Sequence, residues 1–165
     1  MKEGHFYYIK NKYFELISNG KLMKNKIAFD GKEHNRPCFY AFQDNKTKLF
    51  WLIPISSQVE KYKIIYDKKI SKYKKCDTLI FGKVLGYQKA FLLQNMFPVS
   101  EEFINNEYMD NNTNRAVMVE IKLEKLIMKK ARKLLAMYRK GINLIFTDPD
   151  LIEAVLSQKI DKSVN

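Results

Sequence analysis

The residue pattern of the chain changes its period near residue 122, and this change limits the possible folds more than any other feature. Before that point the sequence holds short runs of β-branched and aromatic residues bounded by Asn, Gly, Pro or Asp, which is the pattern of β-strands. Six runs of this kind are His5–Ile9, Pro37–Gln43, Lys48–Ile55, Thr78–Val84, Ala90–Phe97 and Ala116–Lys122. Within them, Phe39–Gln43 and Leu49–Ile53 are joined by Asp44–Lys48 and predict an antiparallel hairpin.

After residue 122 the apolar residues recur every three or four positions, which predicts an amphipathic helix that begins near Leu123 and ends at Gly141. Thr147–Asp150 then supplies a cap and a proline at the first helical position, so a short final helix is expected over 149–158. Strands followed by helices predict an α+β fold: a compact, curved antiparallel sheet or half-open β-barrel with packed helices, the longest near the C-terminus. The length of 165 residues predicts a single domain over 1–165.

The charge of the chain points to a polyanionic partner. Lys and Arg number 30 against 18 Asp and Glu, which gives a net charge of +12. The cations gather in residues 56–89 and 122–140, and an acidic stretch over 90–121 separates these two segments. Segregated charge of this kind predicts positive surfaces on one side of the molecule, and nucleic acid is the first polyanion to consider.

Several classes of protein find no support in the sequence. The longest apolar run, Leu49–Ile55, is far shorter than the roughly 20 residues that cross a bilayer. The N-terminus lacks the pattern of a secretory signal, so we expect a cytoplasmic protein with Cys38 and Cys76 as free thiols. The motifs of P-loop, Rossmann, zincin and α/β-hydrolase enzymes are missing as well.

We expect neither a metal nor a cofactor. The histidines His5 and His34 could join the two cysteines at a zinc ion, but their spacing matches no closed zinc site. The acidic residues between 101 and 110 are expected on a surface and not as the paired clusters of a two-metal nuclease.

Phosphodiester chemistry without a metal is possible on RNA, because the 2′-hydroxyl of RNA can attack the adjacent phosphorus atom. The segment Trp51–Lys63 concentrates suitable residues: a strand reaches a proline and is followed by two serines and two lysines. In the alternative interpretation, Ser57 caps a surface helix and Glu60, three residues later, completes a capping box.

Short motifs in a fixed order add a family resemblance. They are Phe6–Ile9 with Lys12–Tyr13, Asn35–Tyr40, Trp51–Ser57 and Leu92–Val99. The amphipathic helix predicted over 123–141, which we call the lysine-rich helix, follows them. With this succession the sequence resembles the ToxN/AbiQ-type endoribonuclease toxins of type III toxin–antitoxin systems, and among them the CptN-like branch.

The resemblance implies a half-open β-barrel related to the MazF/Kid toxins. It also implies metal-independent, sequence-specific cleavage of single-stranded RNA that leaves 2′,3′-cyclic phosphate ends. The partners that it implies are the RNA substrate and an RNA antitoxin of repeated pseudoknots, which neutralises the toxin in a closed assembly. Such systems serve in growth arrest and phage defence.

The same resemblance suggests catalytic residues. Ser57 and its neighbour Ser56 fall on the paired hydroxyls of the family, and Tyr13 falls on its N-terminal tyrosine. We expect Ser57 to align the 2′-hydroxyl or move its proton and Ser56 to position the backbone. Tyr13 would stack on a base or donate its hydroxyl, although a buried core tyrosine is an equal alternative.

The catalytic lysine departs from the family pattern. Val59 stands where the ToxN branch has a lysine, so Lys61 is expected to take its role and Lys63 is the alternative. Further cations are expected to contact RNA phosphates: Lys10, Lys12, Arg36, Lys63, Lys83, Lys129, Lys130 and Lys133. The last three could instead form an ordinary solvated helix face.

Two other functions remain as alternatives. A non-catalytic basic RNA-binding module would have the same charge without turnover. A membrane-surface protein using the basic helix is less favoured, because the apolar face of that helix is aliphatic and resembles core packing.

Overall fold

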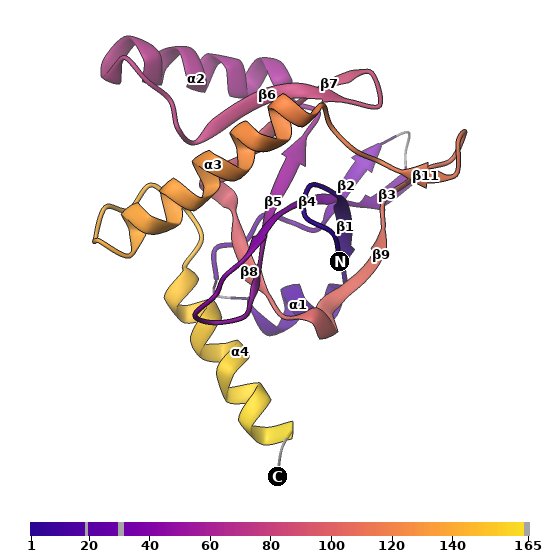
Figure 1. Ribbon diagram of the computed structural model, residues 1–165, viewed down its shortest axis with the longest axis vertical. Coiled ribbons are helices and arrows are strands. Elements are labelled where there is room, and N and C mark those ends of the chain that lie inside the picture. The colour runs from indigo at the N-terminus through magenta and orange to yellow at the C-terminus, as the bar shows by residue number, and fades with distance from the viewer. Residues whose placement is uncertain (19, 30–31, 164–165) are drawn as a thin grey trace.

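The main feature of the structure, a computed structural model that describes residues 1–18, 20–29 and 32–163, is a curved antiparallel sheet (Figure 1). In the described chain this sheet has seven strands, in the spatial order β6-β7-β5-β4-β1-β9, with β8 pairing with β5 outside that path. The strands are β1 (Phe6–Ile9), β4 (Cys38–Gln43), β5 (Phe50–Ser56), β6 (Leu79–Val84), β7 (Tyr87–Leu92), β8 (Phe97–Val99) and β9 (Ile104–Glu107). Strand β5 is central, because it pairs with β4, β7 and β8.

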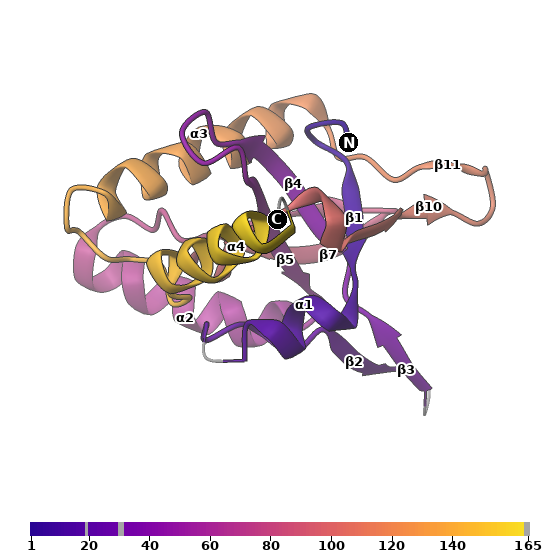
Figure 2. The same ribbon diagram turned by 90° about the horizontal axis from the view of Figure 1, so that it is seen from below.

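Helices and small hairpins surround this sheet (Figure 2). The helices of the described residues are α1 (Asn11–Leu16), α2 (Val59–Tyr73), α3 (Ile121–Tyr138) and α4 (Pro149–Ser163), with 3₁₀ turns η1 (Leu93–Asn95) and η2 (Glu101–Phe103). The hairpins pair β2 (Lys26–Phe29) with β3 (Lys32–Asn35) and β10 (Met109–Asp110) with β11 (Arg115–Ala116). None of these helices combines the length and the apolar content needed to cross a bilayer.

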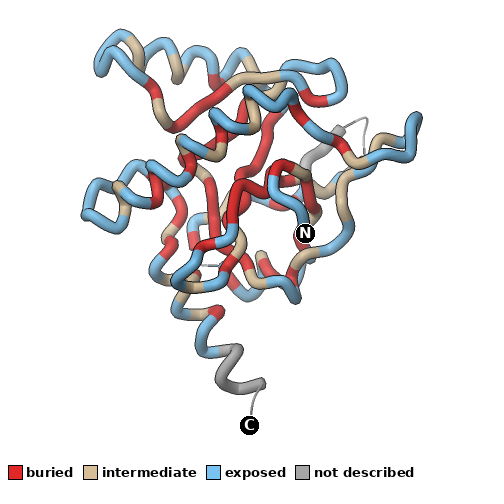
Figure 3. Tube along the Cα trace, in the orientation of Figure 1, coloured by how far each residue is buried: buried red, intermediate tan, exposed pale blue. Residues whose placement is uncertain are grey.

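Both faces of the sheet are covered, and strands β4 and β5 are buried along most of their length (Figure 3). Side chains alternate between the two faces of a strand. Phe39, Trp51 and Ile53 belong to one buried cluster, which includes the apolar face of α3. Tyr40 and Leu52 belong to the other, which includes residues of α1 and α4. Strand β5 is therefore packed against buried apolar residues on both faces of the sheet.

The structure confirms the two predicted C-terminal helices. The lysine-rich helix α3 is the longest of the described residues and ends as predicted: Gly141 has a φ of +83°, and the Ile142 amide donates to the Met137 carbonyl in a Schellman motif. Helix α4 begins at Pro149, as the cap predicted, and continues beyond 158.

Two predicted strands are wrong in part. The run Ala90–Phe97 contains the end of β7, the turn η1 and the first residue of β8; β7 and β8 pair with β5 at two separate places. The chain advances six residues from Phe91 to Phe97 while β5 advances only three from Ile55 to Leu52, so the excess forms the turn η1. The run Ala116–Lys122 contributes only the end of β11, because helix α3 already begins at Ile121.

The predicted α+β fold with a curved antiparallel sheet is confirmed, whereas the half-open barrel is not. Within the described residues the edge strands β6 and β9 do not pair with each other, so the sheet stays open. The predicted hairpin is present as β4 and β5, although a register irregularity between Tyr40 and Phe42 accommodates Ala41 on the same side as Phe42.

An ion pair fixes the turn of this hairpin to the end of α3. The Arg139 guanidinium donates to both carboxylate oxygens of Asp44, which also accepts hydrogen bonds from the Thr47 hydroxyl and the Lys46 amide. Burial raises the pKa of Asp44, but these hydrogen bonds outweigh it and hold the pKa at about 2. The pair thus ties the sheet to the lysine-rich helix.

We expect Asp44→Asn to lower the free energy of unfolding by about 2 kcal/mol at neutral pH. Because the folded pKa lies below the unfolded value of about 3.9, this contribution is present above that value and is lost as the pH falls toward 2. Urea unfolding at neutral and acidic pH measures both effects. The exposed control Asp67→Asn should change stability by less than about 0.5 kcal/mol; an equal loss at both pH values for Asp44→Asn would contradict this account.

Candidate active site

The central strand β5 delivers the two predicted serines to one end of the sheet. Ser56 is the last residue of β5 and pairs with Ala90 of β7, and its hydroxyl oxygen accepts a hydrogen bond of 3.1 Å from the Gln58 amide. Ser56 is buried by this turn, whereas Ser57 is exposed. The hydrogen bond between the Ser56 hydroxyl and the Gln58 amide fixes the backbone on both sides of Ser57. The position of Ser57 is therefore set by the end of β5 and this turn.

The capping-box interpretation of these serines is wrong. Helix α2 begins at Val59, and its N-cap residue is Gln58, which makes no capping hydrogen bond through its side chain. Glu60 is therefore the second residue of the helix and not the third, which a capping box with Ser57 requires. The Ser57 hydroxyl is left for another partner.

That partner is Lys89, which was not among the residues predicted from the sequence. Its ammonium donates to Ser57 Oγ over 2.6 Å. Lys89 precedes Ala90, which pairs with Ser56, so the pairing of β7 with β5 brings Lys89 beside Ser57. Burial lowers the pKa of Lys89. The result is a short, charge-assisted hydrogen bond.

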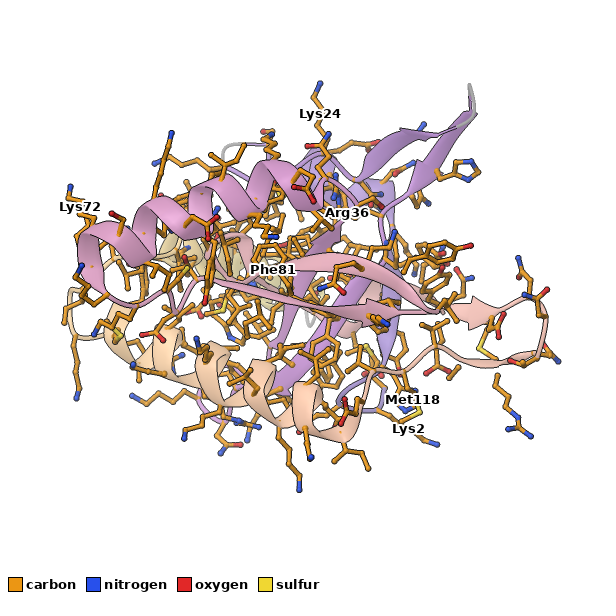
Figure 4. The ribbon with its side chains drawn as sticks, turned by 90° about the horizontal axis from the view of Figure 1, so that it is seen from above. Lys2, Lys24, Arg36, Lys72, Phe81 and Met118 are labelled. Carbon is orange, nitrogen blue, oxygen red and sulfur yellow. The ribbon has the colours of Figure 1, made fainter. Side chains whose placement is uncertain are left out.

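The predicted Arg36 lies beside the same strand end. It follows β3, and its amide donates to the Asn25 carbonyl over 2.7 Å. Its guanidinium donates to the Ile55 carbonyl over 2.7 Å, which leaves other N–H groups for a ligand. In Figure 4, Arg36 lies between the β2–β3 hairpin and the first turn of α2, and Lys24 extends from the same region.

These residues line a pocket of about 460 Å³, which we call the serine pocket: Met23, Lys24, Lys26, Arg36, Ile55, Ser56, Ser57, Gln58, Lys61 and Tyr62. Four of its lining residues are cations, and no acid is among its described lining residues. A concave site with charge of one sign concentrates ligands of the opposite sign. The serine pocket is thus suited to a phosphate group that lies next to a hydroxyl.

The structure brings together four of the predicted site residues and leaves the others apart. Ser56, Ser57, Lys61 and Arg36 line the serine pocket. The remaining predicted cations do not line it: Lys10, Lys12, Lys63, Lys83, Lys129, Lys130 and Lys133. Lys63 lines a different pocket, between α2 and the β6–β7 hairpin, and Lys10 donates to the Glu102 carbonyl.

Two of the three predicted cations of α3 have partners within the protein. Lys130 donates to the Cys76 carbonyl, and both Lys130 and Lys133 form ion pairs with Asp77. These pairs hold α3 against the chain that leads into β6. Lys129 is exposed on the same helix.

Tyr13 is a core residue, which corrects the prediction that it contacts RNA. Its side chain is 0% exposed, and its hydroxyl donates to the Pro98 carbonyl over 2.7 Å. Its ring stacks on Phe97 with the ring centroids 5.6 Å apart. The alternative left open by the sequence, a packed tyrosine, is therefore the correct one.

Three cations near the serines, Lys24, Lys26 and Lys89, were not predicted from the sequence. Lys24 and Lys26 flank Asn25, which is held to the start of the chain because its side-chain amide donates to the Ile9 carbonyl. Lys89 is positioned by strand pairing. Lys89 directly precedes the buried part of β7, which the sequence does indicate. Its proximity to Ser57 could not be predicted, because that requires knowing that β7 pairs with β5.

The described residues contain no group of three or more His, Cys, Asp or Glu side chains that could hold a metal ion. Cys38 and Cys76 are both buried free thiols. Burial raises the pKa of Cys38 to about 12, so this thiol stays protonated.

Comparison with known proteins identifies the fold. No known family profile matches the sequence, and no curated protein matches it. Among solved structures, the chain is similar to AbiQ, a lactococcal anti-phage endoribonuclease belonging to the type III toxin–antitoxin system. The TM-score is 0.67 at 15% sequence identity, and the match covers 95% of this chain and 98% of AbiQ. The chain therefore has the AbiQ fold over nearly its whole length, and at the level of fold this confirms the resemblance to the ToxN/AbiQ-type toxins that its motifs indicated.

Proposed function

We propose that this chain is an endoribonuclease toxin of a type III toxin–antitoxin system, which cuts single-stranded RNA at specific sequences without a metal ion. The observation that carries the proposal is the serine pocket, in which two serine hydroxyls and four cations meet at the end of the central strand. The fold supports it, since AbiQ is an endoribonuclease of such a system.

In the proposed reaction the RNA supplies its own nucleophile. The 2′-oxygen attacks the adjacent phosphorus, the bond from phosphorus to the 5′-oxygen breaks, and the products are a 2′,3′-cyclic phosphate and a 5′-hydroxyl. The 2′-hydroxyl proton leaves to solvent, and the 5′-oxygen gains a proton. The protein must align these atoms, supply the second proton and stabilise the charge of the transition state.

The geometry suggests one role for each group. Arg36 and Lys61 bind the phosphate oxygens and stabilise their charge as it develops, for which the fork of an arginine is well suited. Ser57 aligns the reacting groups, and Lys89, which donates to Ser57, supplies the proton for the 5′-oxygen through this hydroxyl. The lowered pKa of Lys89 favours proton donation. Ser56 holds the turn.

We extend the proposal to the partner. A cytoplasmic RNA antitoxin of repeated pseudoknots would cover the serine pocket and assemble with the toxin into a closed complex. Cations outside the pocket support this, because an RNA larger than the substrate needs phosphate contacts over a wider surface. Exposed lysines on α1, β6 and α3 offer such contacts: Lys12, Lys83 and Lys129.

Incubation of the protein with single-stranded, A-rich RNA in EDTA tests the proposed function. We expect cleavage to fragments that end in a 2′,3′-cyclic phosphate. The matched control is the same RNA with a 2′-deoxy nucleotide at the cleaved position, which removes the nucleophile and should remain intact. Binding without any cleavage would instead favour the non-catalytic RNA-binding module.

A further inference from the structure

A second pocket, of about 290 Å³, adjoins the serine pocket, and we call it the tyrosine pocket after Tyr8, Tyr87 and Tyr108 in its lining. The two pockets share Ile55, and Lys89, which donates to Ser57, also lines the tyrosine pocket. A ligand in the tyrosine pocket is therefore next to the proposed reacting group.

The chain that follows β3 separates the two pockets. Arg36 lines the serine pocket, whereas its neighbours Asn35 and Pro37 line the tyrosine pocket. Consecutive side chains of an extended segment point to opposite sides, so this segment presents a cation to one pocket and an amide to the other. One extended RNA strand can thus contact both pockets at neighbouring positions.

The tyrosines have the geometry of a stacking surface. The rings of Tyr8 and Tyr108 meet edge to face, with centroids 5.6 Å apart. Tyr87 is 73% exposed and follows the β6–β7 turn, where Leu85 and Gly86 have φ of +50° and +81° as in a tight hairpin turn. The hairpin turn therefore sets the backbone position of Tyr87, and its exposed ring is open to stacking by a flat ligand.

Four polar groups of the tyrosine pocket are available to a ligand, whereas Lys89 already donates to Ser57. In the part of the chain that the structure describes, neither the phenol hydroxyls of the three tyrosines nor the Asn35 side-chain amide has a hydrogen-bond partner. Burial raises the pKa of Tyr8 to about 12, so its hydroxyl keeps its proton. A largely apolar pocket with a few convergent polar groups is the usual form of a ligand site.

We propose that the tyrosine pocket binds the base of the nucleotide next to the cleaved phosphate, with Tyr87 stacking on the base and Asn35 reading its edge. This inference rests on the proposed function, since the serine pocket must hold the phosphate. Aromatic faces bind unstacked bases, and an amide offers both a donor and an acceptor to a base edge. The pocket volume of about 290 Å³ is just below the roughly 300–1,000 Å³ of pockets for whole ligands, which suits a single base.

Binding of short 2′-O-methyl RNAs to the intact protein tests this inference, because these RNAs cannot be cleaved. One abasic nucleotide is placed at each position in turn. We expect a single position at which loss of the base weakens binding about 10-fold. In Tyr87→Ala this penalty should disappear, while Tyr73→Ala, which removes an exposed tyrosine at the far end of α2, should keep it.

The role of Asn35 needs a second comparison, in which each of the four bases is placed at that position. The wild-type protein should discriminate among them, and Asn35→Ala should not. An abasic scan without a sensitive position, or variants that weaken all RNAs equally, would overturn the inference. Since binding is measured without turnover, either result can occur while the protein still cleaves RNA; absence of cleavage by the wild-type protein overturns the proposed function instead.

Discussion

Ser57→Ala and Lys89→Met are each expected to lower the rate of RNA cleavage by about 100-fold or more, because a positioned proton donor typically contributes at least that factor. The two residues share one hydrogen bond of 2.6 Å. We therefore expect the double variant to cleave no more slowly than the slower single variant, as happens when two groups act as a unit. Single-turnover cleavage at saturating protein measures the three rates.

The control for these variants is Lys46→Met. Lys46 is exposed in the turn between β4 and β5, at the opposite end of β5 from the serines. This variant removes the same charge as Lys89→Met and should change the rate less than about 3-fold through general electrostatics. Multiplicative losses in the double variant would contradict the shared role, and a loss of RNA affinity without a loss of rate would make Lys89 a phosphate contact only.

Part of this site was predictable from the sequence, because it depends on local order along the chain. The strand that ends before Ser56 and Ser57, and the lysine that follows at 61, are close in sequence, so a motif can reveal them. Arg36 was predicted from the family resemblance, since it matches the basic position before the second strand of the family. Lys89 was not, because its distance from Ser57 depends on the register between β7 and β5, which local patterns do not encode.

The fold shows the same division. The hairpin of β4 and β5, the helix ending at Gly141 and the helix beginning at Pro149 follow from turn and cap residues that act locally. The turn η1 interrupts the predicted strand because the chain pairs with β5 at two separate places. No turn-forming residue pattern between Ala90 and Phe97 predicts this interruption. Tyr13 was ambiguous because an aromatic residue serves equally in a core and on a binding surface; only its burial decides.

Trp51→Ala is expected to lower the free energy of unfolding by about 3–5 kcal/mol, the usual cost of removing a large aromatic side chain from a core. The indole is 0% exposed and stacks on Phe42, with ring centroids 6.2 Å apart. Phe42 in turn lies under the Arg132 guanidinium of α3, 4.6 Å from its ring centroid. The cavity left by Trp51→Ala would thus form where the sheet packs against α3. Because a typical domain has a free energy of unfolding of only about 5–15 kcal/mol, this loss would remove a large part of it.

Trp51→Phe distinguishes the effect of lost side-chain volume from the effect of the buried indole N–H group. Trp51 Nε1 is buried without a hydrogen-bond partner in the described structure, so the phenyl ring loses volume but also removes an unsatisfied donor. We expect a cost of only about 1–2 kcal/mol, measured by urea unfolding with far-UV circular dichroism, because the only tryptophan is absent from both variants. Equal costs for Phe and Ala would mean that the indole N–H has a partner that stabilises the fold. Since Trp51 lies at the end of β5 remote from Ser57, either variant should reduce the fraction of folded protein and leave the cleavage rate per folded molecule unchanged.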